Sequence, residues 1–368
     1  HLGLVGRYLR EHGFSRLTTH MYAALSQGLE MLFLFAYAFG RHSAAKMVHF
    51  VFLIATLTAM ISFGRRFRLG WGAAVAAAFY ACSPVVGVDG TSTYNDIGLA
   101  FYMFLTFYLL LLWDQSRAES LLPVVGLAAG FCYGIKYTGF LAVPVALGFV
   151  LWKGRPRLRP AATAVLFASA FILPWMVKNL VVTGNPLAPL FNAVFPNPYF
   201  HVSFERAYGF LMRHYGGLGE QNWRDYLQVP WELTVKGGKL HVLMGPLFVL
   251  APLALAALRR PMGRRLWLAA AIFALPWLAN IGTRFLIPSM VFVSLAMALA
   301  IGELPRKIGA ALAIALVAAH AVASWPSVVA RWNPREIWRL REPPWKAALR
   351  IEPEVAYLEL PGIMDLAE

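Results

Sequence analysis

The chain has 368 residues, of which 59% are hydrophobic and only 14% are charged. A soluble protein of this size would carry about 25% charged residues, so the composition excludes an ordinary soluble domain. The formal net charge of +15 does not indicate nucleic-acid binding, because much of it lies in loops too short to form a groove. Membrane topology and anionic lipid headgroups explain this charge better.

The N-terminal region 1–46 is predicted to hold two helices that do not cross a membrane. Residues 1–16 place Leu2, Val5 and Leu9 on one helical stripe and charged residues on another, which is typical of an amphipathic helix lying in the membrane interface. The apolar stretch 26–39 contains Glu30 and is too short to span securely. It is expected to form a re-entrant or interfacial helix.

About ten apolar runs follow, and they predict an all-α polytopic transmembrane bundle. The predicted spans are 47–64, 70–88, 97–113, 121–135, 138–152, 161–183, 241–258, 266–280, 284–302 and 307–325. They form a first half-bundle over 47–183 and a second over 241–325. The connection 184–240 is long and rich in aromatic residues, which favours a functional loop over a simple connector. The amphipathic tail 326–368 is expected either to lie along lipid headgroups or to bind an acidic acceptor.

Four short basic loops set the predicted topology: 65–68, 153–159, 259–265 and 306–307. Lys and Arg beside membrane spans mark the cytoplasmic side. Threading the spans between these loops brings one set of polar residues and the loop 184–240 to the opposite face. The set is Glu30, Asp96, Lys136, His241 and Arg284. The pair 121–135 and 138–152 decides this arrangement, because fusing it into one helix would invert every later loop.

Three residues on this face are candidate ligands or catalytic groups. Asp96 opens a span, so it could be a helix cap, a metal ligand or a holder of sugar hydroxyls. Glu30 is an acid in an apolar helix, which is costly unless the carboxylate is used or paired. His241 begins a span, where imidazole can ligate a divalent cation or can simply be interfacial.

Three cations belong to the same face. Lys136 and Arg284 could extend to the interface along their apolar stems, or they could hold a lipid-linked phosphate. Lys178 is a third cation near that face. The sequence contains no P-loop, no dinucleotide fingerprint, no zinc spacing and no nucleophile elbow. These absences favour a donor that arrives through the membrane over a nucleotide-driven reaction.

Five short segments resemble a known family. They are 134–138 (Gly-Ile-Lys-Tyr-Thr), 174–179 (Pro-Trp-Met-Val-Lys-Asn), 183–187 (Thr-Gly-Asn-Pro-Leu), 244–247 (Met-Gly-Pro-Leu) and 284–288 (Arg-Phe-Leu-Ile-Pro). Their order and spacing over roughly residues 1–305 resemble polytopic GT-C-fold glycosyltransferases that use polyprenyl-phosphate sugars. Bacterial protein mannosyltransferases and lipid A aminoarabinose transferases are the most similar members.

The resemblance implies a multi-pass protein of the bacterial inner membrane whose functional face is periplasmic. It implies inverting transfer of a sugar from polyprenyl phosphate to a hydroxyl of a glycan, lipid or protein. By the same resemblance, Lys136 and Arg284 contact the donor phosphate, and Lys178 is a further candidate. Glu30, Asp96 and His241 become candidate ligands of a divalent cation. Asp96 matches an acidic position of the family, and the general base is expected upstream of His1.

Two other functions compete with this one. A non-catalytic subunit could keep a transferase-like scaffold inside a larger membrane complex. A lipid or solute transporter would place charged residues at mid-membrane depth and use broken helices in matching halves. The polar residues here gather instead at one face, which favours the transferase.

Overall fold

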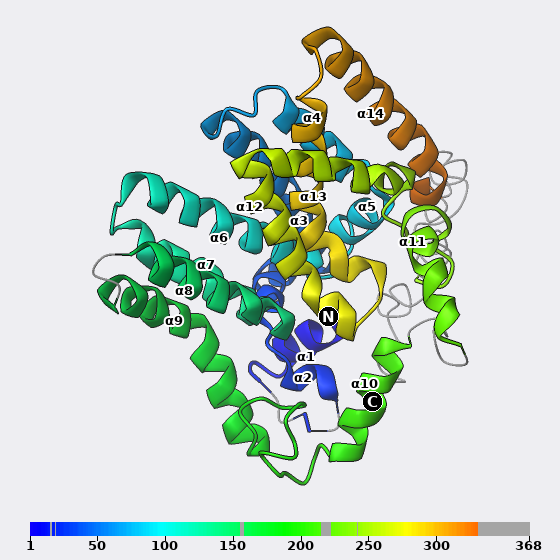
Figure 1. The fold of residues 1–368 in the computed structure, drawn as a ribbon. Helices are drawn as coiled ribbons and strands as arrows, with labels where there is room; N and C mark the ends of the chain where they lie inside the picture. The colour runs from blue at the N-terminus through cyan, green and yellow to red at the C-terminus, as the bar shows by residue number, and fades with distance from the viewer. Residues whose placement is uncertain (15–16, 19, 155–157, 215–221, 241, 330–368) are drawn as a thin grey trace.

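A computed structural model describes residues 1–14, 17–18, 20–154, 158–214, 222–240 and 242–329 (Figure 1). Within these ranges the chain forms helices and no strands, which confirms the predicted all-α class. Residue His241 and most of the tail 326–368 lie outside the described residues.

The helical elements follow one another with short connections, except between α9 and α10. In the first half they are α1 (Leu2–Arg10), α2 (Met21–Ala24), α3 (Gly28–Arg66), α4 (Gly72–Ala81), α5 (Pro84–Gly90), α6 (Asp96–Ser116), α7 (Leu121–Ile135), η1 (Tyr137–Leu141), α8 (Ala142–Lys153) and α9 (Leu158–Thr183). After them come α10 (Val202–Arg213), η3 (Trp223–Gln228), α11 (Val229–Trp231), η4 (Glu232–Lys236), η5 (Pro246–Arg259), α12 (Pro261–Ala274), η6 (Leu275–Ala279), η7 (Thr283–Leu286), α13 (Ile287–Ile301) and α14 (Arg306–Val329).

Five of the described helices are long and apolar enough to cross a membrane, and α4 with α5 makes a sixth if the bent pair is one span. Three shorter apolar helices, Leu121–Ile135, Tyr137–Lys153 and Pro246–Arg259, add to the bundle. The protein is therefore a multi-pass membrane protein, as predicted. The count of about ten spans stays a prediction.

Two of the apolar runs contain breaks. Helix α3 unites the short stretch 26–39 with the span 47–64, but Gly40 and Arg41 have non-helical dihedrals that divide it. The run 70–88 is divided into α4 and α5, which meet at an angle of 72°. Pro84 stands at the start of α5, where its fixed φ suits a new helix and its ring cannot continue the previous one.

Helices α7 and α8 are separate, which is the point on which the predicted topology depends. The Arg117 guanidinium, just before α7, donates a hydrogen bond of 2.6 Å to the carbonyl of Lys153 at the end of α8. The start of α7 therefore lies beside the end of α8, so the chain reverses at Lys136. The alternative of one long helix is excluded.

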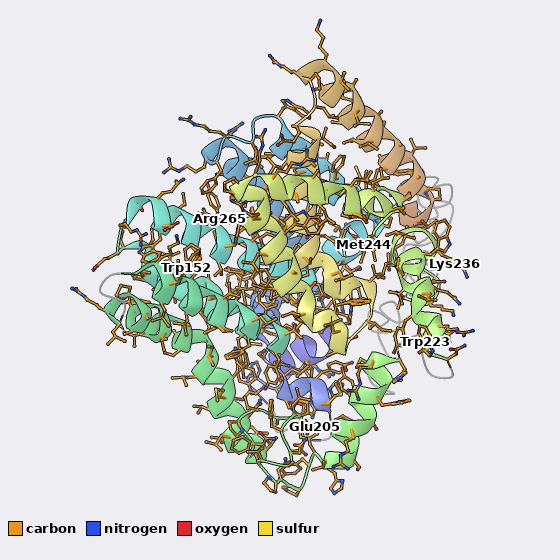
Figure 2. All side chains as sticks on the ribbon, in the orientation of Figure 1. Trp152, Glu205, Trp223, Lys236, Met244 and Arg265 are labelled. Atoms are coloured by element: carbon orange, nitrogen blue, oxygen red, sulfur yellow. The ribbon has the colours of Figure 1, made fainter. Side chains whose placement is uncertain are left out.

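Ion pairs join the basic loops at one end of the bundle, here called the basic end (residues 65–69, 114–120, 153–154, 158–159, 259–265 and 303–307). Asp114 pairs with Arg117 at 2.9 Å and lies 3.7 Å from Arg265. Arg159 lies 3.9 Å from Glu119, and Arg260 pairs with Glu303. In Figure 2 Arg265 is labelled in the upper left part of the molecule, whereas Glu205 of α10 is labelled near its lower end. The loops predicted to share a side do share one end.

Helix α13 forms the centre of the bundle. Almost all of its residues are buried, and it packs against α4, α6, α12 and η5. Arg284 lies in η7, immediately before α13, and Glu303 follows its other end. The most buried helix thus fixes a cation at one end of the bundle and a carboxylate of the basic end at the other.

Glycines bring α7 and α9 into close contact on one flank, where Figure 1 shows them side by side. A Cβ on Gly126 would lie 2.4 Å from the Ala164 carbonyl oxygen, and one on Gly130 would lie 2.3 Å from that of Ala168. Small residues four apart allow helix backbones to approach in membranes. This seam holds the end of α7 against α9 near the polar residues described below.

We expect Gly130→Ala to destabilise the protein by about 1–3 kcal/mol, because the added methyl would overlap the α9 backbone. Gly148→Ala in α8 is the matched control, since nothing lies within 4 Å of the position of its Cβ. Thermal unfolding in detergent measures both. Equal midpoints for the two variants would contradict the close α7–α9 contact.

Candidate functional site

Three residues predicted from the sequence meet at the end of the bundle opposite the basic end. Asp96 is the first residue of α6 and is 1% exposed. The Lys136 ammonium lies 2.6 Å from Asp96 Oδ1, and Arg284 Nε lies 3.8 Å from Asp96 Oδ2. We call these three residues the Asp96 cluster. The structure therefore brings together a carboxylate from α6, a cation from the connection between α7 and η1, and a cation from η7.

Aromatic rings support both cations. The Lys136 ammonium lies 4.1 Å from the centroid of the Phe285 ring, and the Arg284 guanidinium carbon lies 5.0 Å from the same ring. Arg284 also lies 4.8 Å from the ring centroid of Tyr94. Ring faces attract cations and restrict where the side chains can go. The two positive charges are thus held in place by aromatic rings as well as by Asp96.

The cluster is buried on its acidic side and open on its cationic side. The Asp96 side chain is 2% exposed, whereas Lys136 and Arg284 are 18% and 40% exposed. Burial lowers the pKa of the Lys136 ammonium from its ordinary value, and the adjacent Asp96 carboxylate opposes that shift. A ligand that approaches this end would meet the cations first, so the arrangement suits an anion.

Two buried residues beside the cluster were not predicted from the sequence. Asp89 Oδ1 accepts a hydrogen bond of 3.1 Å from the Ile97 backbone N–H, so it caps α6 in the role considered for Asp96. His49 Nε2 lies 3.6 Å from Asp89 Oδ1. Each is an ionisable residue in or beside an apolar run, a signal that alone marks a candidate site. The sequence analysis did not predict either residue as part of a site, because His49 lies inside the predicted span 47–64 and Asp89 directly follows the predicted span 70–88.

Several polar atoms around these residues are buried without a hydrogen-bond partner in the described part of the chain. They are Asp89 Oδ2, Asp96 Oδ2, His49 Nε2, the Tyr80 hydroxyl and the Thr283 hydroxyl. Leaving buried polar atoms unsatisfied is costly, and such groups call for an explanation. Their concentration at one end of the bundle makes this end the candidate functional site.

Glu30 lies at the same end, in the first turn of α3. Its Oε1 pairs with Nδ1 of His1, and the His1 ring meets the Tyr94 ring edge-on at 6.2 Å. Tyr94 in turn lies under Arg284. Contacts therefore connect Glu30 to the Asp96 cluster through His1 and Tyr94. The His1 contact also gives the buried Glu30 carboxylate the partner that its burial requires.

Lys178 makes different contacts from Lys136 and Arg284. Its ammonium donates to the carbonyls of Ala23 and Leu25 at 2.6 and 3.3 Å and lies 5.2 Å from the Trp175 ring. These contacts anchor the segment around α2 to α9. A role in binding the donor phosphate stays a prediction for Lys178. Its hydrogen bonds to backbone carbonyls already give the ammonium a structural role.

The neighbouring motif residues complete the same anchor. The Asn179 amide donates to the Ala24 carbonyl at 2.6 Å, and the Tyr137 hydroxyl donates to the Ala188 carbonyl at 2.8 Å. Asn185 Oδ1 accepts from the Leu187 backbone N–H at 2.8 Å. Three of the five resembling segments, 134–138, 174–179 and 183–187, thus meet in one hydrogen-bonded junction. The junction holds the chain that leads into Glu30.

The predicted metal ligands do not form a metal centre in the described residues. Within the described ranges no three His, Cys, Asp or Glu side chains are grouped so that they could hold a metal ion. Asp96 already faces two cations, and Glu30 is paired with His1. His241, the third predicted ligand, lies outside the described residues. Metal binding by Glu30, Asp96 and His241 stays a prediction.

Comparison with known proteins identifies the fold. The chain matches a crystal structure of the oligosaccharyltransferase of Archaeoglobus fulgidus, determined in complex with Zn and sulfate, with a TM-score of 0.58 and 16% identity over 95% of this chain and 52% of that chain. The chain has a GT-C fold. The apo form of the same enzyme matches with a TM-score of 0.55 and 15% identity, over 95% of this chain and 55% of that one. The GT-C chain therefore spans about half the length of these solved structures.

A family comparison agrees with the fold. Residues 31–181 match the family of dolichyl-phosphate-mannose-protein mannosyltransferases. This range contains Asp96 and Lys136 and two of the junction segments. No curated protein matches the chain. The resemblance inferred from the short motifs is thus confirmed at the level of the GT-C fold.

We expect Lys136→Met to destabilise the protein by about 3 kcal/mol, because it would leave the buried Asp96 carboxylate with only Arg284 opposite it. Asp96→Asn in the same background should recover part of this loss, since the uncompensated charge is then removed. Lys307→Met, at an exposed position in α14, is the control. Reversible unfolding in mixed micelles measures each free energy. A loss in Lys307→Met as large as in Lys136→Met would refute the proposed importance of the pair.

Proposed function

We propose that this protein is an integral membrane glycosyltransferase that moves a sugar from a polyprenyl-phosphate donor to an acceptor hydroxyl. The observation that carries the proposal is the Asp96 cluster, in which two partly exposed cations are fixed by a buried carboxylate and an aromatic ring. The GT-C fold and the match to a dolichyl-phosphate-mannose-dependent family support the same class of donor.

The charge change of the reaction matches the cluster. The acceptor oxygen attacks the anomeric carbon, the bond from that carbon to the phosphate oxygen breaks, and its electron pair stays on the phosphate. The phosphodiester carries one negative charge and the departing phosphate monoester carries up to two. Lys136 and Arg284 therefore attract the leaving group more strongly in the transition state than in the bound donor, which is the requirement for catalysis.

Asp96 has a positioning role in this proposal. One of its oxygens accepts from Lys136 and the other faces Arg284, so it holds the two cations apart and directs them toward the open side. Single displacement by the hydroxyl would invert the anomeric carbon. The hydroxyl proton passes to a general base other than Asp96, because Asp96 is already paired with Lys136 and faces Arg284.

The described part of the region between α9 and η5 supplies the proposed acceptor side. Glu205 of α10 accepts from the backbone N–H groups of Phe191 and Asn192, both at 3.0 Å, which fixes the loop after α9 onto α10. Burial raises the pKa of the Tyr208 hydroxyl on the same helix, and the positive charge of Arg284 opposes that shift. We propose that this region covers the donor and selects the acceptor.

Arg284→Ala should lower the consumption of a polyprenyl-phosphate-linked sugar by about 10²–10³-fold, the loss typical for removing one group that stabilises developing charge. Arg284→Lys should retain part of the activity because it keeps the charge without the bidentate fork. Arg65→Ala, which changes an exposed arginine at the basic end, is the matched control. The assay follows labelled donor in membranes that contain the full chain. Unchanged consumption by Arg284→Ala would remove the proposed site.

We further propose that the Asp96 cluster faces the periplasm of a bacterial inner membrane and that the basic end faces the cytoplasm, as the positive-inside rule requires. In a background without Cys82 and Cys132, Tyr199→Cys should react with an impermeant maleimide in intact spheroplasts. Arg66→Cys should react only after permeabilisation. Labelling of Arg66→Cys but not of Tyr199→Cys in intact spheroplasts would show that the proposed orientation is wrong.

A further inference from the structure

The basic end contains a cavity that the proposed transferase reaction does not use. Its volume is about 340 Å³, and it lies between the turn after α3, the end of α6 and the start of α12. A single water needs only about 10–15 Å³ of such space, so the cavity can hold a larger group. Arg68, Arg260, Arg265 and Gln115 provide its polar lining.

The cavity is separated from the Asp96 cluster by the full length of one helix. Asp96 is the first residue of α6, and Gln115 is next to the last. A helix of 21 residues is about 30 Å long. A ligand in the cavity would therefore not touch the proposed donor site, and the two sites can be tested independently.

The arginines of the cavity are only partly neutralised by carboxylates. Arg260 pairs with Glu303, while Arg265 lies 3.7 Å from an Asp114 carboxylate that Arg117 already binds at 2.9 Å. In the described part of the chain Arg68 has no carboxylate partner. The cavity thus keeps an excess of positive charge, although no reaction at this end of the bundle requires it.

The position of Arg68 adds a second observation. Its φ of +58° is the left-handed conformation that follows the end of α3, and the Leu69 N–H bonds back to the Gly64 carbonyl at 2.8 Å. Helices that end in this way favour glycine at the left-handed position, because a side chain there is strained. An arginine at this position directs a guanidinium to the cavity at a conformational cost.

The remaining lining is apolar, with Phe67, Leu69, Met262 and Leu299 among its residues. A cavity lined by both arginines and apolar side chains fits a group that is itself amphipathic or that carries a compact negative charge. Arginine forks match the geometry of phosphate oxygens. We propose that this cavity binds a phosphate-bearing anion, with Arg68, Arg260 and Arg265 as its cationic ligands.

Two sources could supply this phosphate: the headgroup of an anionic phospholipid or a soluble phosphate. The test compares them on the full-length protein in detergent. Thermal unfolding is followed while phosphatidylglycerol, phosphatidylcholine or inorganic phosphate is added, since a ligand that binds only the folded state raises the midpoint. Phosphatidylcholine is the control lipid because its headgroup carries no net charge.

The variants are Arg68→Gln and the double change Arg68→Gln with Arg265→Gln, and Arg66→Gln is the matched control. Arg66 is exposed in the same turn but does not line the cavity. Arg68→Gln removes no described ion pair, so this variant should fold. We expect its apparent Kd for the anion to rise about tenfold, as for the loss of one charge-assisted contact, and the double variant to lose the shift.

A midpoint shift with phosphatidylglycerol that Arg66→Gln keeps and the double variant loses would support the site with a lipid as its source. The same pattern with inorganic phosphate alone would support it with a soluble ligand. Equal shifts in Arg66→Gln and the double variant would show diffuse attraction by the whole basic end and would overturn the proposal. The absence of any shift with either anion would overturn it as well.

Discussion

The buried ion pair between Asp96 and Lys136 is the contact on which the functional end of the bundle depends. Removing both charges from water costs several kcal/mol per ion, and their attraction repays this only when geometry and further contacts are favourable. Here Arg284 faces the second carboxylate oxygen, and Phe285 lies beside both cations. Because a well-packed apolar pair would be at least as stable, stability alone does not account for these charges. The anion-binding role that we propose for Lys136 and Arg284 would account for them.

The hydrogen-bonded junction explains why short motifs far apart in sequence signal this fold. Tyr137, Lys178, Asn179 and Asn185 do not contact the Asp96 carboxylate; they bind backbone carbonyls and N–H groups of α2 and the loop after α9. Such groups must be satisfied wherever irregular chain is buried, and a specific side chain is needed for each. Lys136 and Tyr137 are adjacent, so one turn contributes a cation to the cluster and a hydroxyl to the junction. The position of the site is therefore coupled to the packing of the chain around it.

The sequence predicted the fold class and most of the cluster because both follow from charge. Basic loops between apolar runs determine which helix ends lie on the same side of the membrane. This assignment alone predicted that Asp96, Lys136 and Arg284 lie at one end of the bundle. It could not reveal that Asp89 caps α6 or that His49 lies beside it, because those contacts depend on the angle between α4 and α5. Pro84 signals that break, but a bend angle of 72° is set by packing. The partners of Lys178 were equally hidden, since α2 has only four residues and no periodic pattern.

The two ends of the bundle use charge in opposite ways. At the Asp96 cluster, one buried carboxylate faces two partly exposed cations that lie against aromatic rings, which is suited to stabilising charge that develops during a reaction. At the basic end, Asp114 lies near two arginines, and Glu119 and Glu303 each lie near one. The arginines there outnumber these described carboxylates, and the excess positive charge is exposed. Topology requires basic residues there, but it requires neither a cavity nor an arginine in a left-handed turn. Helix α6 runs from Asp96 at the cluster to Gln115 at the cavity, so one helix contributes a residue to each of the two sites.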